Sequence, residues 1–464
     1  MSRSIPSMMM RTGALLCLGL LFFGPDVEGA EAPSAGALER EAEGAFSERR
    51  YPQTLELLDR LGDNRSLSTH ARTLKTKTLI ELGRPKDALD VYDQVAKDQG
   101  RDEEALLETV AMGFIRVLFK DMREQMRGAA YTALKELESE DVVPDLEDGL
   151  SDGSGLVRAL AAEALSQLQN GRKSPRLRKA MEDQASMVRA NVVRAVGLNG
   201  DKRERPLLEQ ALNDEQPMVR VQAIGALLRF GRKESWTGLT QAAKAANPEA
   251  RSTALRVMGE LKDPRGLEFA IAGSRDPQPS VRGGAAAALG LFGKAEGLEP
   301  LVTLMNDKIP AVRSSAAVAL GELSRKEAVP VLRKAFHDPD PGVKGAAVDS
   351  MLRLGEPFPE IEEAVRSLMR AQDPGPRSAV AKALGRGAGL NRQAALAYLD
   401  QILHDPLPRP RIAAARSLGR IGSREHIPDL KEALRDQDAA VQATAAASLI
   451  RLLRQDQQAV HARF

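Results

Sequence analysis

The chain has 464 residues, a formal net charge of +2, and almost equal numbers of basic and acidic side chains, 66 against 64. This balance excludes the strong electrostatic field that draws proteins to nucleic acid or to anionic lipid. Aromatic residues make up only 3% of the chain, so few large side chains remain as binding anchors.

The first 29 residues have the order of a secretory signal peptide. Arg3 and Arg11 precede a mostly apolar run, 14–23, and the chain then reaches Gly29 through small or modest residues. We predict cleavage after Gly29 and an exported protein, periplasmic or secreted. The apolar run is shorter than the roughly 20 residues that span a bilayer, and no membrane span is expected after cleavage. A lipid anchor on Cys17, or an uncleaved N-terminal anchor, is the alternative.

Cys17 is the only cysteine, so the mature chain would have no thiol for a disulfide, a metal or a nucleophile. Residues 30–101 are predicted to form helical hairpins. Segments 51–58 and 85–92 align at a spacing of 34 residues. They resemble the tetratricopeptide repeat, a helix pair of that length, although Thr54 stands where that family prefers alanine. Two ordinary hairpins that cap the next part of the chain are the alternative.

Residues 102–454 contain eleven copies of one pattern, most of them 31 residues apart. Each copy is anchored by an apolar residue, and in all but the last copy a cation follows it. The anchors are Met126, Val157, Val188, Val219, Ala250, Val281, Val312, Val343, Pro376, Pro410 and Val441. A fixed period of this length is typical of supersecondary units stacked into a solenoid.

Within a copy, positions counted from the anchor predict an α-helix. Ala285, Ala288 and Leu289 stand at +4, +7 and +8 from Val281 and share one helix face. A shorter helix with proline near its start is expected before each anchor. Glycine at +9 is expected to end the longer helix, as glycine does at C-terminal caps. These glycines are Gly197, Gly259, Gly290, Gly321, Gly385 and Gly419.

An aspartate stands five residues before the anchor in nine copies. They are Asp121, Asp152, Asp183, Asp214, Asp276, Asp307, Asp338, Asp405 and Asp436. Ala245 and Ala371 replace it in the other two. An aspartate here can accept backbone N–H groups and meet the cation after an anchor. We expect a ladder of Asp–Arg contacts along the stack, with a structural role.

The string from Asp307 to Gly321 resembles the HEAT repeat, in particular the short HEAT-like class of phycobilin lyase subunits. The resemblance implies an all-α fold, an α-solenoid or superhelix of stacked helical hairpins. We expect a long curved rod, with the polar tail 455–464 as a terminal cap. This fold carries scaffolds, lyases, hydroxylases and DNA-repair modules, so it does not by itself name a function.

The sequence offers no catalytic set. None of the five histidines has a histidine four residues away or is followed by glutamate, as the iron-carrying HEAT hydroxylases require. His337 and His404, each before an aspartate, are interpreted as turn residues. The densest basic cluster, residues 172–179, is interpreted as a solvated surface. We therefore predict no catalytic residue, no metal, no cofactor and no nucleic-acid partner.

The inner side of the solenoid is the predicted binding surface. Positions +2, +3 and +6 are expected to face a groove with a smooth middle between flanking cations. The candidate groove residues are Arg194, Arg256, Gly283, Gly284, Ala287, Ser314, Ser315, Val318, Lys382 and Arg416. Such a floor fits a helix or an extended segment of a partner protein. We predict a non-catalytic scaffold for protein–protein interaction in a bacterial envelope. An enzyme or enzyme subunit of the HEAT-like lyase type is the alternative.

Overall fold

The computed structural model describes residues 34–387 and 389–461, which form helices joined by short turns. The predicted signal peptide, residues 1–29, lies outside the described residues. Within these two ranges there is no β-strand, and the predicted all-α solenoid is confirmed. No helix in this part of the chain is long and apolar enough to span a membrane.

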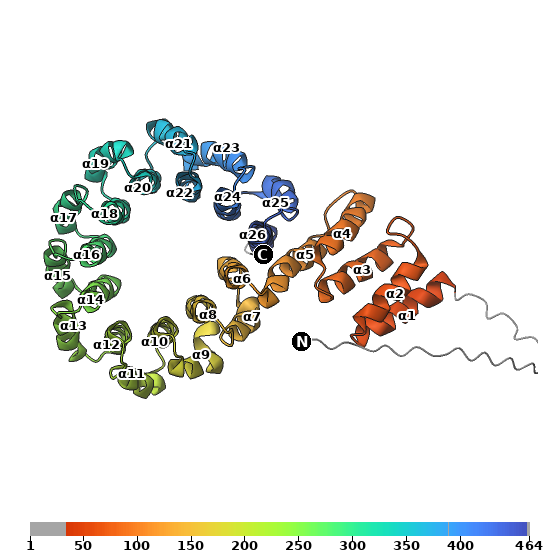
Figure 1. Ribbon diagram of the computed structural model, residues 1–464, viewed down its shortest axis with the longest axis horizontal. Helices are drawn as coiled ribbons and strands as arrows, with labels where there is room; N and C mark the ends of the chain where they lie inside the picture. The colour runs from red at the N-terminus through yellow and green to blue at the C-terminus, as the bar shows by residue number, and fades with distance from the viewer. Residues whose placement is uncertain (1–33, 388, 462–464) are drawn as a thin grey trace, which may run out of the picture.

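The N-terminal helices project outside the main body of the molecule (Figure 1). Helices α1 and α2 pack together, as do α3 and α4, so the segment contains two helical hairpins. Their likeness to the tetratricopeptide repeat stays a prediction. Part of this segment has small apolar cores of its own, one of which includes Leu38, Leu58 and Leu74. The helices are α1 (Ala35–Ser47), α2 (Tyr51–Leu61), α3 (Thr69–Glu81), α4 (Pro85–Gln99) and α5 (Glu104–Arg116).

The repeat region forms two layers, one inside the other (Figure 1). The inner helices are α6 (Glu124–Leu137), α8 (Gly155–Gln167), α10 (Ser186–Asn199), α12 (Pro217–Arg229), α14 (Pro248–Leu261), α16 (Pro279–Phe292), α18 (Pro310–Glu322), α20 (Pro341–Arg353), α22 (Pro374–Leu384), α24 (Pro408–Ile421) and α26 (Ala439–His461). The outer helices are α7 (Val143–Gly149), α9 (Pro175–Lys179), α11 (Arg205–Ala211), α13 (Ser235–Ala243), α15 (Leu267–Gly273), α17 (Leu298–Leu304), α19 (Val329–Lys334), α21 (Glu362–Met369), α23 (Arg392–Leu403) and α25 (Ile427–Ala433).

Short 3-10 turns connect many of these helices. They are η1 (Val117–Lys120), η2 (Glu140–Val142), η3 (Gly171–Lys173), η4 (Ala180–Glu182), η5 (Lys202–Glu204), η6 (Pro264–Gly266), η7 (Ala295–Gly297), η8 (Lys326–Ala328), η9 (Ala335–His337), η10 (Phe358–Glu360), η11 (Gly389–Asn391) and η12 (Arg424–His426). Proline stands in the first turn of outer helices α11, α19 and α25, as predicted. The backbone N–H that proline lacks would have no acceptor within the helix at this position, so proline costs no hydrogen bond there.

Five of the six glycines at +9 lie inside their inner helices, so the prediction is wrong for them, whereas Gly385 is the C-terminal cap of α22 as predicted. Gly259 and Gly290 lie inside α14 and α16. A Cβ at Gly259 would come within 2.8 Å of Ala288 Cα on the next inner helix, and one at Gly290 within 3.0 Å of Ala319 Cα. Glycine is needed here because neighbouring inner helices approach too closely for a side chain.

In most copies the inner helix ends at +10 or +11, and the residue at +12 is its C-terminal cap or the residue after the cap. In seven copies this residue has a positive φ, the left-handed conformation that closes many helices. Four of the seven are glycine and three are not. They are Gly200, Gly231, Gly293, Gly355, Glu138, Lys262 and Ser324. The helix end is harder to recognise in the sequence at +12 than at +9, because three of the seven residues with positive φ at +12 are not glycine.

The predicted ladder of Asp–Arg contacts is present and is highly regular. Arg189 donates from Nε and Nη2 to the two carboxylate oxygens of Asp214, at 2.6 and 2.8 Å. Its Nη1 donates to the backbone carbonyl of Asp183. Each such contact therefore joins one copy to the next through a bidentate pair. The pairs are Arg127–Asp152, Arg158–Asp183, Arg189–Asp214, Arg251–Asp276, Arg282–Asp307, Arg313–Asp338, Arg377–Asp405 and Arg411–Asp436.

The ladder carboxylates also hold the turns before the inner helices. Asp214 Oδ1 accepts a hydrogen bond from the N–H of Gln216. The hydrogen bonds from Arg189 keep the pKa of Asp214 below its ordinary value of 3.8. The ladder is interrupted where alanine replaces aspartate. Arg220 faces the copy of Ala245 and donates only to the carbonyls of Asp214 and Glu215.

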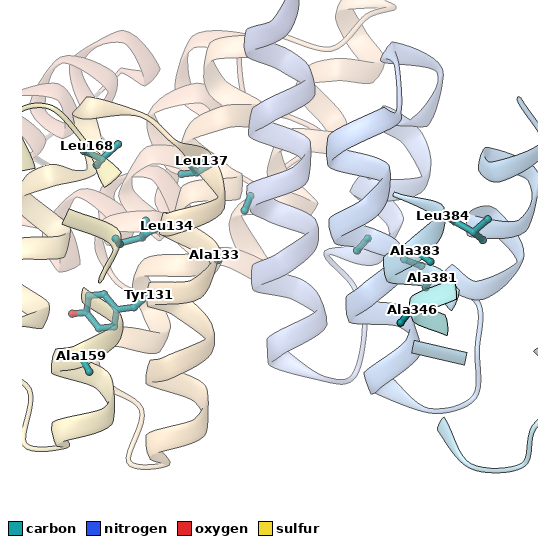
Figure 2. Packing of buried hydrophobic residues seen from close by; sticks show 14 of the residues in the cluster. Tyr131, Ala133, Leu134, Leu137, Ala159, Leu168, Ala346, Ala381, Ala383 and Leu384 are labelled. Carbon is teal, nitrogen blue, oxygen red and sulfur yellow. The ribbon is translucent and has the colours of Figure 1, made fainter. Parts of the chain in front are cut away.

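The solenoid does not end as an open rod, because its two ends are in contact. Helix α26 packs against α24 on one side and against α5 and α6 on the other, which closes the inner layer into a ring (Figure 1). One continuous apolar core runs through the closure, from Leu89 to Leu453. Figure 2 shows part of this core, with Tyr131 and Leu134 of α6 and Leu384 of α22.

Helix α26 is covered on every side in its first half, where Gln442, Thr444 and Ser448 are buried together with the apolar side chains. Every residue from 440 to 450 is buried. A terminal unit of an open solenoid needs a polar outer face to stay soluble. The helix also continues to His461, over the first residues of the predicted tail.

Ion pairs surround the closure, and those between residues that the structure describes have the same polarity. The cations come from the C-terminal end of the chain and the acids from the N-terminal end. The pairs are Arg416–Glu136, Arg420–Glu136, Arg424–Glu104, Lys431–Asp93, Lys431–Asp102, Arg435–Asp90, Arg435–Asp93, Arg451–Glu138, Arg454–Glu108 and Arg454–Asp141. This matched polarity favours one way of joining the ends over others.

Candidate protein-binding surface

The inner helices have one face that no other layer covers. Positions +4 and +5 contact the outer helices: Gly273 of α15 lies against Ala285 and Leu255, and Gly238 of α13 lies against Ile224. On a helix of 3.6 residues per turn, positions −1, +6 and +10 lie on the opposite face. These three positions therefore line the inside of the ring. We call this the inner face.

Three of the predicted groove cations lie on the inner face with their side chains in solvent. Arg194 of α10, Arg256 of α14 and Lys382 of α22 are exposed. They stand at +6, on helices separated by other copies, so the fold distributes them around the ring and does not cluster them. None of the three forms an ion pair with another described residue, although most cations of the ladder do.

The predicted smooth floor lies on α16 and α18, two neighbouring inner helices. Gly283, Ala287, Ser314, Ser315 and Val318 are half-buried there. Ser315 Oγ donates to the carbonyl of Ala311 in its own helix. The floor is therefore narrow and offers few polar groups to a partner.

Two predicted groove residues serve the fold. Gly284 is buried, and a Cβ there would collide with Ser252 of α14. Arg416 lies at the closure, where its Nε is 3.3 Å from Glu136 Oε1. Both residues stand at positions that the repeat pattern assigns to the groove. The pattern does not show that the C-terminal copies contact α6, and so it could not place Arg416 at the closure.

The most exposed apolar side chains of the inner face were not among the predicted residues. Leu156 of α8 is 51% exposed, and Met187 and Leu198 of α10 are 49% and 40% exposed. Leu156 and Met187 are both at −1, and Leu198 is at +10. The sequence contained a signal for these residues at position −1. That position is leucine in α8 and methionine in α10, whereas it is serine, alanine and glycine in α16, α18 and α20. We call Leu156, Met187 and Leu198 the apolar patch.

A cavity of about 740 Å³ adjoins the apolar patch at the C-terminal ends of α6, α8 and α10. Leu198 lines it together with Leu168, Gln167 and Lys173. The side chain of Lys173 is exposed and forms no ion pair among the described residues. The cavity is thus open and partly apolar, and its lining carries both charges, because Glu138 and Glu140 line it together with Arg172 and Lys173.

Two of the five cations in the basic cluster of residues 172–179 form ion pairs within the chain, whereas Lys173 and Lys179 are exposed and form none among the described residues. Arg176 pairs with Asp148, and Arg178 pairs with Glu204. Arg172 donates to the carbonyls of Ser166 and Gln167.

His404 and His426 lie at helix ends or in turns and take part in local hydrogen bonds, whereas His70 of α3 contacts Glu43 of α1. His404 Nδ1 lies 2.9 Å from the carbonyl oxygen of Asp400, one turn earlier in the chain. His426 Nδ1 lies 3.2 Å from the N–H of Ser423. Among the described residues, no group of three or more histidine, cysteine, aspartate or glutamate side chains is placed to hold a metal ion.

The two-layer stack of helix pairs, with its repeated Asp–Arg contacts, defines an α-solenoid of short helical repeats. A family model described as HEAT repeats matches residues 111–197, 174–242, 236–317, 298–360 and 395–461, more than half of the chain. The chain therefore belongs to the HEAT repeat family. No curated protein matches the sequence.

Solved structures with a similar course of the chain include proteins of several kinds. The complex of CpcE and CpcF of phycocyanin lyase from Nostoc sp. PCC7120 matches with 18% identity, a TM-score of 0.35, and coverage of 53% of this chain and 94% of that one. Human deoxyhypusine hydroxylase matches with 22% identity, a TM-score of 0.28, and coverage of 62% and 98%. Kap95p, solved in complex with RanGDP, matches with 12% identity, a TM-score of 0.37, and coverage of 94% and 67%. At these values the likenesses say nothing about what this chain binds.

Proposed function

We propose that this chain is an exported, non-catalytic scaffold that binds a partner protein through the inner face of its HEAT ring. One observation carries the proposal. The regularly repeated charges are mostly used within the chain, whereas Arg194, Arg256 and Lys382 on the inner face are exposed and unpaired within the described chain. Side chains of this kind are available to a partner.

The inner face also has the composition expected of a surface for a protein segment. It combines small residues on α16 and α18 with the apolar patch on α8 and α10. A surface of small and apolar residues between cations can receive a helix or an extended strand of another protein.

The test is site-specific crosslinking in intact cells, followed by identification of the captured proteins. The variant Arg256→Glu with Lys382→Glu should reduce capture strongly and leave helicity and the melting temperature unchanged, because neither side chain is paired. The matched control is Lys334→Glu, an exposed cation on outer helix α19. Undiminished capture by the inner-face variant would remove the inner face from the proposal.

The export and the lack of catalysis have their own measurements. N-terminal sequencing of the protein from fractionated cells should find a chain that begins at Ala30, outside the cytoplasm. The purified protein should be colourless and free of stoichiometric metal. Bound pigment or metal at one equivalent would favour an enzyme of the lyase type.

A further inference from the structure

The apolar patch and its neighbouring cations form a surface distinct from the rest of the inner face. Met187, Arg194 and Leu198 are seven and four residues apart, so they lie in one row along α10. Leu156 stands at the equivalent position to Met187 on the adjacent helix α8. The row from Met187 to Leu198 is about 16 Å long, from a rise of about 1.5 Å per residue.

The other large apolar side chains that are exposed in the described chain lie in turns or at helix starts. Val117 begins η1, Met122 lies in the turn before α6, and Leu407 precedes α24. Among the helices whose side chains the structure describes, only α8 and α10 present large exposed apolar side chains along the open face. Exposed apolar groups gathered on one face are characteristic of interaction sites.

The charge at the patch is also unusual for this chain. Arg194 lies between Met187 and Leu198, and Lys173 lines the cavity beside Leu198. Neither cation forms an ion pair among the described residues. By contrast, the neighbouring Arg176 and Arg178 are paired with acids. An acidic group from another molecule could form ion pairs with Arg194 and Lys173.

We propose that the apolar patch, Arg194 and Lys173 bind an amphipathic helix of a partner protein that carries acidic residues beside its apolar ones. About three turns of helix match the length of the row. Apolar side chains at i and i+4 would contact Met187 and Leu156 at one end of the row, and one at i+11 would contact Leu198 at the other. A carboxylate near i+7 would contact Arg194. The cavity at the helix ends receives the end of the bound helix. The proposal rests on the proposed function and names the chemistry of the partner.

A second copy of this chain is a poorer occupant. The described part of the chain has no other helix that exposes large apolar side chains beside acids. The partner is therefore expected to be a different protein, and self-association is one outcome of the test.

The experiment is selection from a displayed library of helical peptides on the purified full ring, followed by titration of the selected peptides. The expected peptides contain two or more large apolar residues and an aspartate or glutamate on the same face. Arg194→Glu and Met187→Asp should each weaken their binding about ten-fold or more. A peptide with lysine in place of its acid should regain binding to Arg194→Glu.

The matched control variants lie outside the inner face: Lys334→Glu, at an exposed cation of outer helix α19, and Met122→Asp, at an exposed methionine in the turn before α6. They should leave binding unchanged, and the melting temperature of all four variants should match that of the parent. Selected peptides that depend on Arg256 and not on Arg194 would overturn this inference and still support binding by the inner face. No selected peptide, or self-association of the ring that Met187→Asp abolishes, would also overturn it. In-cell capture tests the proposed function separately.

Discussion

Arg454 donates from Nε to Glu108 Oε1 over 3.0 Å, although 346 residues separate the two in the sequence. The contact joins α26, at the end of the chain, to α5, at the start of the repeats. It belongs to a set of ion pairs in which the C-terminal end supplies the cations and the N-terminal end the acids. The inner face is consequently the inside of a closed ring and not the groove of an open rod.

The closure should depend on Glu136, which lies near both Arg416 and Arg420. In Glu136→Arg three cations would meet, and we expect a loss of about 2 kcal/mol at the closure. Small-angle scattering should then show a larger radius of gyration. The control is Glu299→Arg, an exposed glutamate on α17. An unchanged radius and melting temperature for Glu136→Arg would mean that packing by α26 alone closes the ring.

The ladder should give unequal effects at two residues of the same copy. Asp214→Ala leaves the almost buried Arg189 without its carboxylate, and we expect a loss of about 2–3 kcal/mol. Arg220→Ala removes only hydrogen bonds to carbonyls, and we expect about 1 kcal/mol. Thermal melting measures both. Equal losses would argue against a structural role for the bidentate pair.

The interruption of the ladder at Ala245 should be repairable. Ala245→Asp places a carboxylate where Arg220 can reach it, at the position that Asp276 takes for Arg251. We expect the melting temperature to rise, by the equivalent of about 1 kcal/mol. The double variant Ala245→Asp with Arg220→Ala serves as the control and should lose this gain. A rise that persists in the double variant would show that the aspartate acts only on the turn.

The +9 glycines should tolerate no side chain. Alanine normally stabilises a helix relative to glycine by about 0.5–1 kcal/mol. Gly259→Ala should instead destabilise the fold by about 1–3 kcal/mol, because its Cβ would meet the backbone of Ala288. Gly44→Ala is the matched control, since Gly44 lies in α1 with nothing near its missing Cβ. Melting of the two variants should shift in opposite directions.

Acid should weaken the ladder in a defined range. Hydrogen bonds from Arg189 and Arg282 lower the pKa of Asp214 and Asp307 below the ordinary 3.8. A lowered pKa in the folded state gives stability that is present above pH 3.8 and is lost as the pH falls through the folded value. The melting temperature should therefore change little from pH 7 to about pH 5 and fall steeply below about pH 4. Asp214→Asn should fall less on acidification, and an equal fall would contradict this origin.

The sequence predicted the ladder well because its residues recur with the architecture. Asp214 and Arg189 each occupy a fixed position in the repeat, and equivalent positions on stacked units meet. The sequence misjudged Gly259, since the same glycine can end a helix or admit a neighbour, and only the distance to Ala288 distinguishes the two. It placed Arg416 in the groove because the pattern does not say that the last copy has a neighbour beyond it.

The repeat by itself determined the all-α fold, the two layers and the contacts between successive copies, because each of these depends on residues about 31 positions apart. Only the tertiary structure decided that the stack curves far enough to bring α26 against α5 and α6. The curvature is the sum of small rotations at each helix–helix contact, and no single repeat specifies that sum. The burial of the whole stretch 440–450, polar Gln442, Thr444 and Ser448 included, is likewise decided only in the tertiary structure, because the covering helices α5 and α6 lie far away in the sequence.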